Sequence, residues 1–183
     1  MEIVKNLTQS KLLKTLSIIF LGTVLLAVSS KIKIPFYPVP MTMQTLVVLI
    51  IGIGFGWKLG VATIALYLFE GIIGLPVFSG TPEKGFGLVY FTGPTMGYLI
   101  GFLVAVFFAG KFVYNKNVIY NFLKLTFAIS FIYILGVLWL GTLIGWEKPI
   151  FKLGAQPFLL AELFKILIVT FSITQIKKIK KIF

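Results

Sequence analysis

Long apolar runs separated by short polar connections dominate the hydropathy pattern of this chain. About 20 consecutive apolar residues form a helix long enough to cross the hydrocarbon core of a bilayer. The pattern therefore predicts an all-α integral membrane protein with six transmembrane helices, in a single membrane domain over residues 1–183. The second run is short, and we expect its neighbours to shield it. The six predicted spans are residues 12–30, 41–56, 58–75, 94–111, 118–144 and 155–176.

The connections between these runs are short, with two exceptions. Residues 31–40 contain several prolines, which favour a stiff, extended backbone. The outer loop at residues 76–93 is rich in glycine, proline and aromatic residues, and long loops of this kind often act as lids or binding loops. Glycines at positions 52, 54, 56 and 60 permit a tight reversal between the second and third spans.

The N-terminal segment is positively charged and leads into the first apolar run, as in a signal peptide. This run is long for a signal peptide, and a series of further apolar runs follows it. We therefore interpret residues 12–30 as the first transmembrane span.

The composition excludes much catalytic chemistry. The chain is 58% hydrophobic and contains no histidine, cysteine, aspartate or arginine. Without histidine and cysteine, the usual zinc, haem and iron–sulfur ligand sets and the Ser-His-Asp or Cys-His arrangements cannot form. A P-loop for ATP hydrolysis is missing as well. We therefore expect no metal, no cofactor and no stand-alone enzyme.

The net charge of +12 would suggest nucleic-acid binding in a soluble protein, but here its distribution predicts membrane topology. With six spans, 11 of the 17 lysines fall on the side of the two termini and 5 on the other, while Lys165 lies within a span. The positive-inside rule then places both termini in the cytoplasm. We expect membrane lipid, and no nucleic acid, as a partner.

A charged pair, Glu162 and Lys165, stands inside the otherwise apolar last span. Two residues three positions apart share one face of a helix and can partly neutralise each other. A charge at mid-membrane costs roughly 2.5–3.5 kcal/mol on insertion scales, so such residues usually face a polar interior and have a function. Spacing alone is equally compatible with a structural ion pair that lets the helix insert.

Other polar residues are predicted to converge on the same outer face. Gln44 lies one turn into the second span, Thr95 and Tyr98 open the fourth, and Lys84 stands in the outer loop. This clustering favours an outward-open ligand pocket. Glutamate, lysine and glutamine would suit a small, partly apolar ligand with an amide- or urea-like end, and Lys84 is the candidate for its acidic tail. We interpret Glu70 as a helix-end residue rather than a ligand.

Four blocks of the sequence carry recognisable motifs in a fixed order. Over about residues 20–170 they resemble the BioY family, the biotin-binding membrane subunits of energy-coupling-factor (ECF) transporters. The blocks are Ile34–Leu46 (IPFYPVPMTMQTL), the LY, EG, GLPVF and TPEKG elements of residues 66–85, Gly93–Phe102 (GPTMGYLIGF) and Pro157–Lys165 (PFLLAELFK).

The last two blocks depart from the family pattern. Glu162 stands where the family has aspartate, Leu160 replaces its proline and Ala161 its glycine, and Met96 replaces the first glycine of a pair. The longer glutamate must reach a ligand from a slightly different position. The lost proline and glycine predict a more regular first turn in the last span.

The resemblance implies a function, an architecture and partners. The fold would be the six-helix bundle of an ECF substrate-capture (S) subunit, in the cytoplasmic (inner) membrane of a bacterium. The acid and the lysine of the last span, Glu162 and Lys165, would hold the ureido ring of biotin. A transmembrane coupling subunit, driven by ATP-binding subunits, would dock on small residues of the first span, for which Gly22, Thr23 and Ala27 are the best match. Generic packing inside the bundle would explain these small residues nearly as well.

Two alternatives remain open from the sequence. The departures at residues 96 and 160–162 keep a capture subunit for a different small vitamin in view. The other alternative is a small membrane enzyme acting on an acyl or lipid substrate, with Glu162 as general base. The absence of histidine and aspartate and the outward position of the site weigh against this enzyme.

Overall fold

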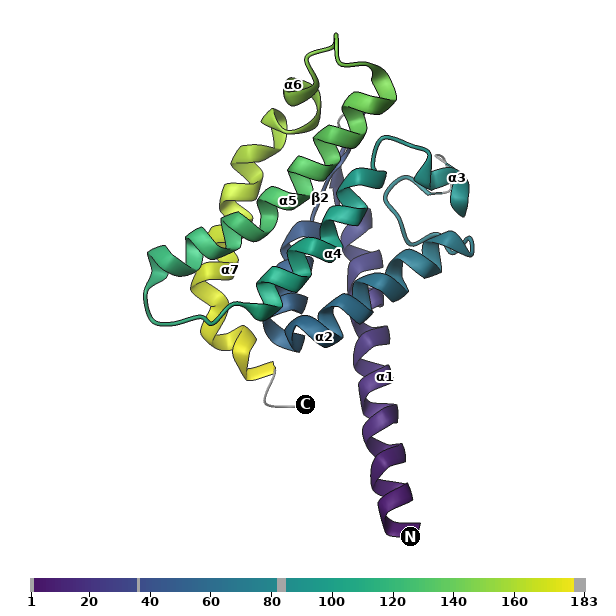
Figure 1. Ribbon diagram of the computed structural model, residues 1–183, viewed down its shortest axis with the longest axis vertical. Helices are drawn as coiled ribbons and strands as arrows, with labels where there is room; N and C mark the ends of the chain where they lie inside the picture. Colours follow the sequence, from purple (N-terminus) through teal and green to yellow (C-terminus); the bar gives the residue numbers. More distant parts are fainter. Residues whose placement is uncertain (1, 36, 82–84, 180–183) are drawn as a thin grey trace.

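The protein folds as an all-α membrane bundle, as the hydropathy pattern predicts. The computed structural model describes residues 2–35, 37–81 and 85–179, and its elements follow one another in the order in which Figure 1 labels them. They are α1 (Glu2–Lys31), β1 (Lys33–Ile34), β2 (Met41–Thr42), α2 (Gln44–Ile72), α3 (Leu88–Phe91), α4 (Met96–Lys111), α5 (Val118–Ile144), α6 (Ile150–Gly154), the 3-10 helix η1 (Gln156–Phe158) and α7 (Leu159–Ile179).

Within the described residues, four helices are long and apolar enough to cross a membrane: Lys11–Lys31, Gln44–Ile72, Val118–Ile144 and Ile150–Ile179. The apolar helix α4 is shorter, with 16 residues. The helix α2 covers both the second and the third predicted spans, because the chain bends inside it. With α2 counted as two segments, the structure accounts for all six predicted membrane helices.

The bend in α2 lies at Gly56. This residue has φ 77° and ψ 170°, a backbone conformation that is essentially restricted to glycine. Gly110 of α4 allows the bend to pack closely, since a Cβ at this position would lie 2.4 Å from the backbone nitrogen of Trp57. The second half of α2 therefore turns away sharply from the first, and both halves can pack on α4 (Figure 1).

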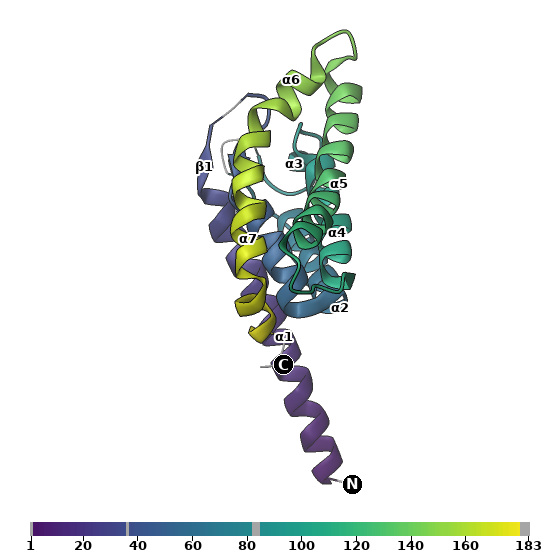
Figure 2. The same ribbon diagram turned by 90° about the vertical axis from the view of Figure 1, so that its left-hand side faces the viewer.

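The molecule has two distinct ends. The helix α1 begins and α7 ends at the same end, which we call the terminal end (Figures 1 and 2). There the ammonium of Lys177 donates a hydrogen bond of 3.0 Å to the carbonyl of Tyr114 in the connection between α4 and α5. The opposite end, which we call the pocket end, carries α3, α6 and the hairpin of β1 and β2, in which Lys33 pairs with Thr42 and Ile34 with Met41.

The loop after α2 is fastened to the end of α1. Lys31 Nζ donates to the carbonyl of Phe78 at 2.9 Å and to the hydroxyl of Thr81 at 3.1 Å. The hydroxyl of Ser30 donates to the carbonyl of Val77 at 2.8 Å. Phe78 is fully buried and lies so close to Gly71 that any side chain there would overlap its ring. These contacts hold residues 77–81 in one position at the pocket end.

Candidate functional site

Glu162 and Lys165 form a buried ion pair on the first turns of α7. Lys165 Nζ lies 2.7 Å from Glu162 Oε1, and the two residues are 5% and 4% exposed. The chain is helical from Leu159, so Leu160 and Ala161 belong to a regular first turn, as the loss of the family's proline and glycine predicts. The three-residue spacing in this helix brings the two charges together.

The ammonium of Lys165 uses all three of its protons within the protein. Besides Glu162, it donates to the carbonyl of Thr42 at 2.6 Å and to the hydroxyl of Thr45 at 3.0 Å. Lys165 therefore joins α7 to strand β2 and to the first turn of α2. A buried ion pair needs such additional hydrogen bonds, because desolvation of the two charges otherwise exceeds their attraction.

The carboxylate of Glu162 is only half satisfied. Oε1 accepts from Lys165 and from the hydroxyl of Thr45 at 2.8 Å. Oε2 is buried but accepts no hydrogen bond from any residue in the described part of the chain. An unsatisfied buried acceptor costs about 1–3 kcal/mol, and more when it is charged, so such atoms are rare in folded proteins. An N–H or O–H donor from a ligand would remove this cost.

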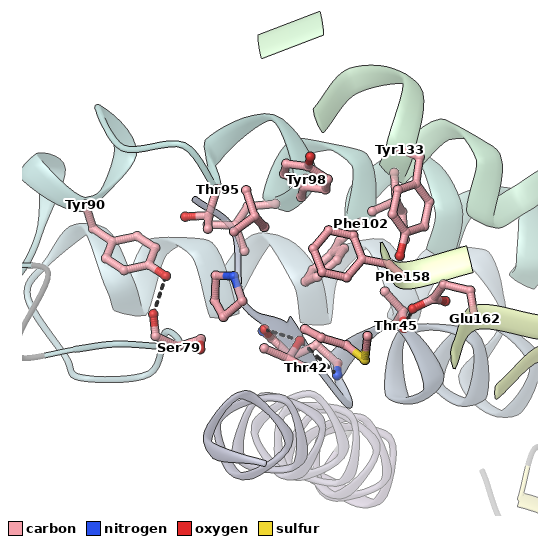
Figure 3. Close-up of a pocket in the computed structure, with 16 residues that line it drawn as sticks. Thr42, Thr45, Ser79, Tyr90, Thr95, Tyr98, Phe102, Tyr133, Phe158 and Glu162 are labelled. Carbon is pink, nitrogen blue, oxygen red and sulfur yellow. Dashed lines mark hydrogen bonds between the residues drawn. The ribbon is translucent and has the colours of Figure 1, made fainter. Parts of the chain in front are cut away.

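Glu162 borders a cavity of ≈ 50 Å³ at the pocket end, which we call the inner cavity. Its walls come from the hairpin, α2, the loop after α2, α3, α4, α5, η1 and α7 (Figure 3). Apolar and aromatic groups line most of it, with a few polar groups between them, as is typical of small-molecule sites. The lining residues are Val39, Pro40, Met41, Thr42, Gln44, Thr45, Ser79, Tyr90, Thr95, Tyr98, Leu99, Phe102, Ile132, Tyr133, Phe158 and Glu162.

The structure brings together four of the six predicted ligand-binding residues in this lining: Gln44, Thr95, Tyr98 and Glu162. Gln44 donates to the hydroxyl of Tyr67 at 2.8 Å, and the hydroxyl of Tyr98 donates to the carbonyl of Gly154 at 2.7 Å. The polar atoms of both residues thus have partners within the protein. The ring of Tyr98 supplies part of the cavity wall.

The other two predicted ligand residues lie elsewhere. Lys165 is not part of the lining of the inner cavity and borders a separate apolar groove between the hairpin and α7. Lys84 lies outside the described residues. Direct contacts of these two lysines with a ligand therefore stay predictions.

Among the polar residues of the cavity, the sequence reasoning missed Thr42, Thr45, Ser79 and Tyr133. Thr45 follows Gln44 directly and belongs to the same sequence block, which is a signal for its role. Tyr133 is one of seven tyrosines, lies in an apolar helix and has no distinguishing pattern. In Figure 3 its hydroxyl points toward Glu162. Only the packing of α5 against α7 shows that it belongs to the site.

Ser79 lies at the end of the cavity opposite Glu162 (Figure 3). The hydroxyl of Tyr90 donates to the carbonyl of Ser79 at 2.5 Å. Burial raises the pKa of the Tyr90 hydroxyl, which therefore keeps its proton and remains a donor at neutral pH. The hydroxyl of Ser79 is buried and has no hydrogen-bond partner among the described residues.

The residues predicted for subunit docking lie on or near the contact between α1 and α2. Gly22 is buried, and a Cβ there would lie 2.5 Å from Cγ2 of Thr63. The hydroxyl of Thr23 donates to Oε1 of Glu70 at 2.8 Å, so Glu70 joins α2 to α1. Ala27 is half-buried and packs against the core. Packing within the chain accounts for Gly22 and Thr23, and docking on this helix stays a prediction.

The chemistry available in the inner cavity is recognition. No group of three or more histidine, cysteine or acidic residues that could hold a metal ion occurs in residues 2–35, 37–81 and 85–179. The cavity offers one charged acceptor, several hydroxyls and an aromatic wall. This set suits a ligand with polar N–H or O–H groups at one end and an apolar ring or chain between its ends.

Comparison with known proteins agrees with this interpretation. The model of the family described as "BioY family" matches residues 4–181. A protein of Pyrococcus horikoshii named "Probable biotin transporter BioY" is 34% identical over 83% of this chain and 89% of its own length. A "Biotin transporter BioY" of Thermotoga maritima is 33% identical over 86% of this chain and 92% of its own.

Among solved structures, the fold is similar to that of "the S-component for biotin from an ECF-type ABC transporter". The match has a TM-score of 0.77 and 24% sequence identity, and it covers 92% of this chain and 93% of that protein. The arrangement of the helices is therefore that of an S-component.

Proposed function

This chain belongs to the BioY family, and we propose that it is a biotin transporter that captures biotin in the inner cavity beside Glu162. The protein is a multi-pass membrane protein and serves as a substrate-binding subunit, not as an enzyme. The two relatives compared above are named "Probable biotin transporter BioY" and "Biotin transporter BioY", and at 33–34% identity they match most of this chain.

One observation carries the proposal: Oε2 of Glu162 is a buried, charged acceptor without a partner in the described structure, and it borders a cavity. Biotin has two ureido N–H donors, one ureido carbonyl, an apolar thiophane ring and a carboxylate tail. A ureido N–H would donate to Oε2, in a charge-assisted hydrogen bond. The aromatic wall formed by Tyr98, Phe102 and Phe158 would enclose the apolar ring.

The ureido carbonyl needs a donor near Glu162. Tyr133 is one cavity-lining candidate, since its hydroxyl points toward this carboxylate in Figure 3. Gln44 is another, because its amide has a second N–H besides the one that it donates to Tyr67. Lys165 would serve only by giving up one of its three internal acceptors, because all of its protons are engaged. We propose that Lys165 acts mainly by holding the carboxylate charged and in place. Lys84, outside the described residues, is the proposed contact of the carboxylate tail.

The partners follow from the same family membership. We propose that the chain works with a transmembrane coupling subunit and ATP-binding subunits, since it lacks a P-loop of its own. The proposed location is the cytoplasmic membrane, with the terminal end in the cytoplasm, where most lysines would lie. The inner cavity would then open toward the outside, where biotin is captured.

Titration calorimetry of the detergent-purified chain with biotin is the experiment that tests the proposal, with thiamine and riboflavin as control ligands. Tight one-to-one binding that is selective for biotin is expected. Absence of heat with biotin, or equal binding of the control vitamins, would contradict biotin capture.

A further inference from the structure

Two buried side-chain atoms lack a hydrogen-bond partner in the described structure, Oε2 of Glu162 and Oγ of Ser79, and both residues line the inner cavity. They lie at opposite ends of it (Figure 3). The proposed function uses only Glu162. A ligand that binds Glu162 at one end of the cavity could therefore form a second hydrogen bond with the hydroxyl of Ser79 at the other end.

Ser79 is held firmly in place. Its carbonyl accepts from Tyr90, and the neighbouring carbonyls of Val77 and Phe78 accept from Ser30 and Lys31 of α1. Ser79 itself is 4% exposed. A hydroxyl on such a fixed backbone binds a ligand at a lower cost in conformational entropy than one on a mobile loop.

More empty space lies next to the inner cavity, on the side of Tyr90 and Thr95. A second cavity of ≈ 400 Å³, which we call the outer cavity, shares Tyr90 and Thr95 with the inner one. Its other walls are Tyr37, Pro38, Gly93, Pro94, Leu143 and Ile144. The inner cavity of ≈ 50 Å³ has room for only a few water molecules at about 10–15 Å³ each. A ligand of vitamin size needs more room than the inner cavity alone provides, and the outer cavity is the neighbouring space available to its end.

The described side chains that line the Ser79 end of the cavity carry no charge. No charged side chain among the described residues lines the outer cavity, and the only charged group of the inner cavity is Glu162 at its other end. The tail of free biotin is a carboxylate at neutral pH, and a serine hydroxyl can donate to a carboxylate oxygen as well as to the C=O of an amide, with the stronger hydrogen bond to the charged group. Within the described residues, this end of the site therefore has no cation that would select for the free acid. The proposed contact of Lys84 with the carboxylate tail would add such a preference, and the affinities expected below limit it to about tenfold.

We infer that the capture site accepts amide-linked, tail-extended forms of biotin as well as the free acid, with the Ser79 hydroxyl binding the tail carbonyl and the extension lying in the outer cavity. This inference rests on the proposed function. It widens the substrate class from biotin to biotin joined through its carboxyl group to an amine, as in biotinyl-lysine.

The first test is calorimetry with biotin, biotinamide and Nε-biotinyl-lysine on the intact chain and on Ser79→Ala. The intact chain is expected to bind both amides within about tenfold of biotin. Ser79→Ala is expected to lower the affinity for all three ligands by about tenfold, which corresponds to the loss of one hydrogen bond. Ser29→Ala is the matched control, because Ser29 is also 4% exposed but donates to the carbonyl of Leu26 on α1, away from the cavity.

The second test fills the outer cavity without touching Ser79. Leu143→Trp is expected to lower the affinity for biotinyl-lysine by about tenfold or more, because the larger side chain would clash with the extension. The affinity for biotinamide should stay nearly unchanged. Leu138→Trp, at an exposed position of α5 outside both cavities, is the control. Melting temperatures of all variants report whether each one is folded.

The outcomes separate the two proposals. If the intact chain binds biotin but binds both amides more than about a hundredfold more weakly, the inference is overturned and biotin capture is retained. Unchanged binding of all three ligands to a folded Ser79→Ala would remove the role of Ser79. Failure of biotin itself to bind would contradict the proposed function.

Discussion

Thr45 on α2 and Glu162 on α7 are 117 residues apart in the chain and are joined by a hydrogen bond of 2.8 Å. The hydroxyl of Thr45 donates to Oε1 of Glu162 and at the same time accepts from Lys165 at 3.0 Å. Because Thr45 and Lys165 both donate to Oε1, Oε2 is left without a hydrogen-bond partner among the described residues, in a side chain that borders the inner cavity. The ion pair is thus part of a three-residue network that fixes the carboxylate and leaves one of its oxygens for the proposed ligand contact.

Replacing Glu162 by glutamine is expected to weaken biotin binding and also to lower the melting temperature, because the buried ammonium of Lys165 loses its anion. Glutamine keeps the shape of the side chain but removes the charge that strengthens a hydrogen bond from a ureido N–H. A hydrogen bond to a charged group contributes about 1.5–3 kcal/mol, which corresponds to a loss of roughly 10- to 150-fold in affinity. Calorimetry measures this, with Glu147→Gln at an exposed position as the control. Wild-type affinity in Glu162→Gln would refute the ligand contact.

Replacing Lys165 by methionine is expected to destabilise the protein as well as the site. The change leaves Glu162 charged, buried and without its cation, and breaking a buried pair in this way costs about 3–5 kcal/mol. The melting temperature in detergent should fall clearly, whereas Lys152→Met at an exposed position should not change it.

The double variant Glu162→Gln with Lys165→Met should recover part of the lost stability, because no charge then remains buried. Coupling energies between contacting residues are about 0.5–3 kcal/mol. Strictly additive effects of the two substitutions would contradict a coupled pair.

Replacing Gly56 by alanine is expected to disturb the bend of α2. Holding a non-glycine residue at φ 77° and ψ 170° costs about 1–3 kcal/mol. A lower melting temperature in Gly56→Ala is the expected result. Gly54→Ala is the control, since a Cβ there would contact Ile176 at an ordinary 3.5 Å. Equal stability of the two variants would show that the bend does not depend on glycine.

The docking hypothesis is best tested at Ala27. Gly22 and Thr23 pack against α2 inside the chain, so larger residues there would disturb the fold itself. Ala27→Leu is expected to reduce co-purification with the coupling and ATP-binding subunits and to leave biotin binding intact, because close helix contacts need small residues. Ala65→Leu, an exposed position on α2, is the control. Unchanged assembly of Ala27→Leu would exclude docking at this residue.

The sequence by itself determined the class of the fold and the chemistry of one end of the ligand. Apolar runs of membrane length predict the helices, because a bilayer leaves few alternatives to a helix for such segments. The reversal at Gly56 is visible in the glycine pattern. The charged pair of Glu162 and Lys165 is visible as well, because a spacing of three residues is a local property of a helix and needs no knowledge of how helices pack.

The tertiary structure alone decided which atoms are free to bind. The sequence predicts a ligand contact for Lys165, and only the structure shows that Thr42 and Thr45, more than a hundred residues away, accept hydrogen bonds from its ammonium. The Ser79 hydroxyl has no partner among the described residues, while backbone carbonyls fasten the loop around it. Tyr133 reaches the site because α5 packs beside α7. Hydrogen bonds between distant segments depend on the packing of whole helices, and a pattern of residue types along the chain does not encode this packing locally.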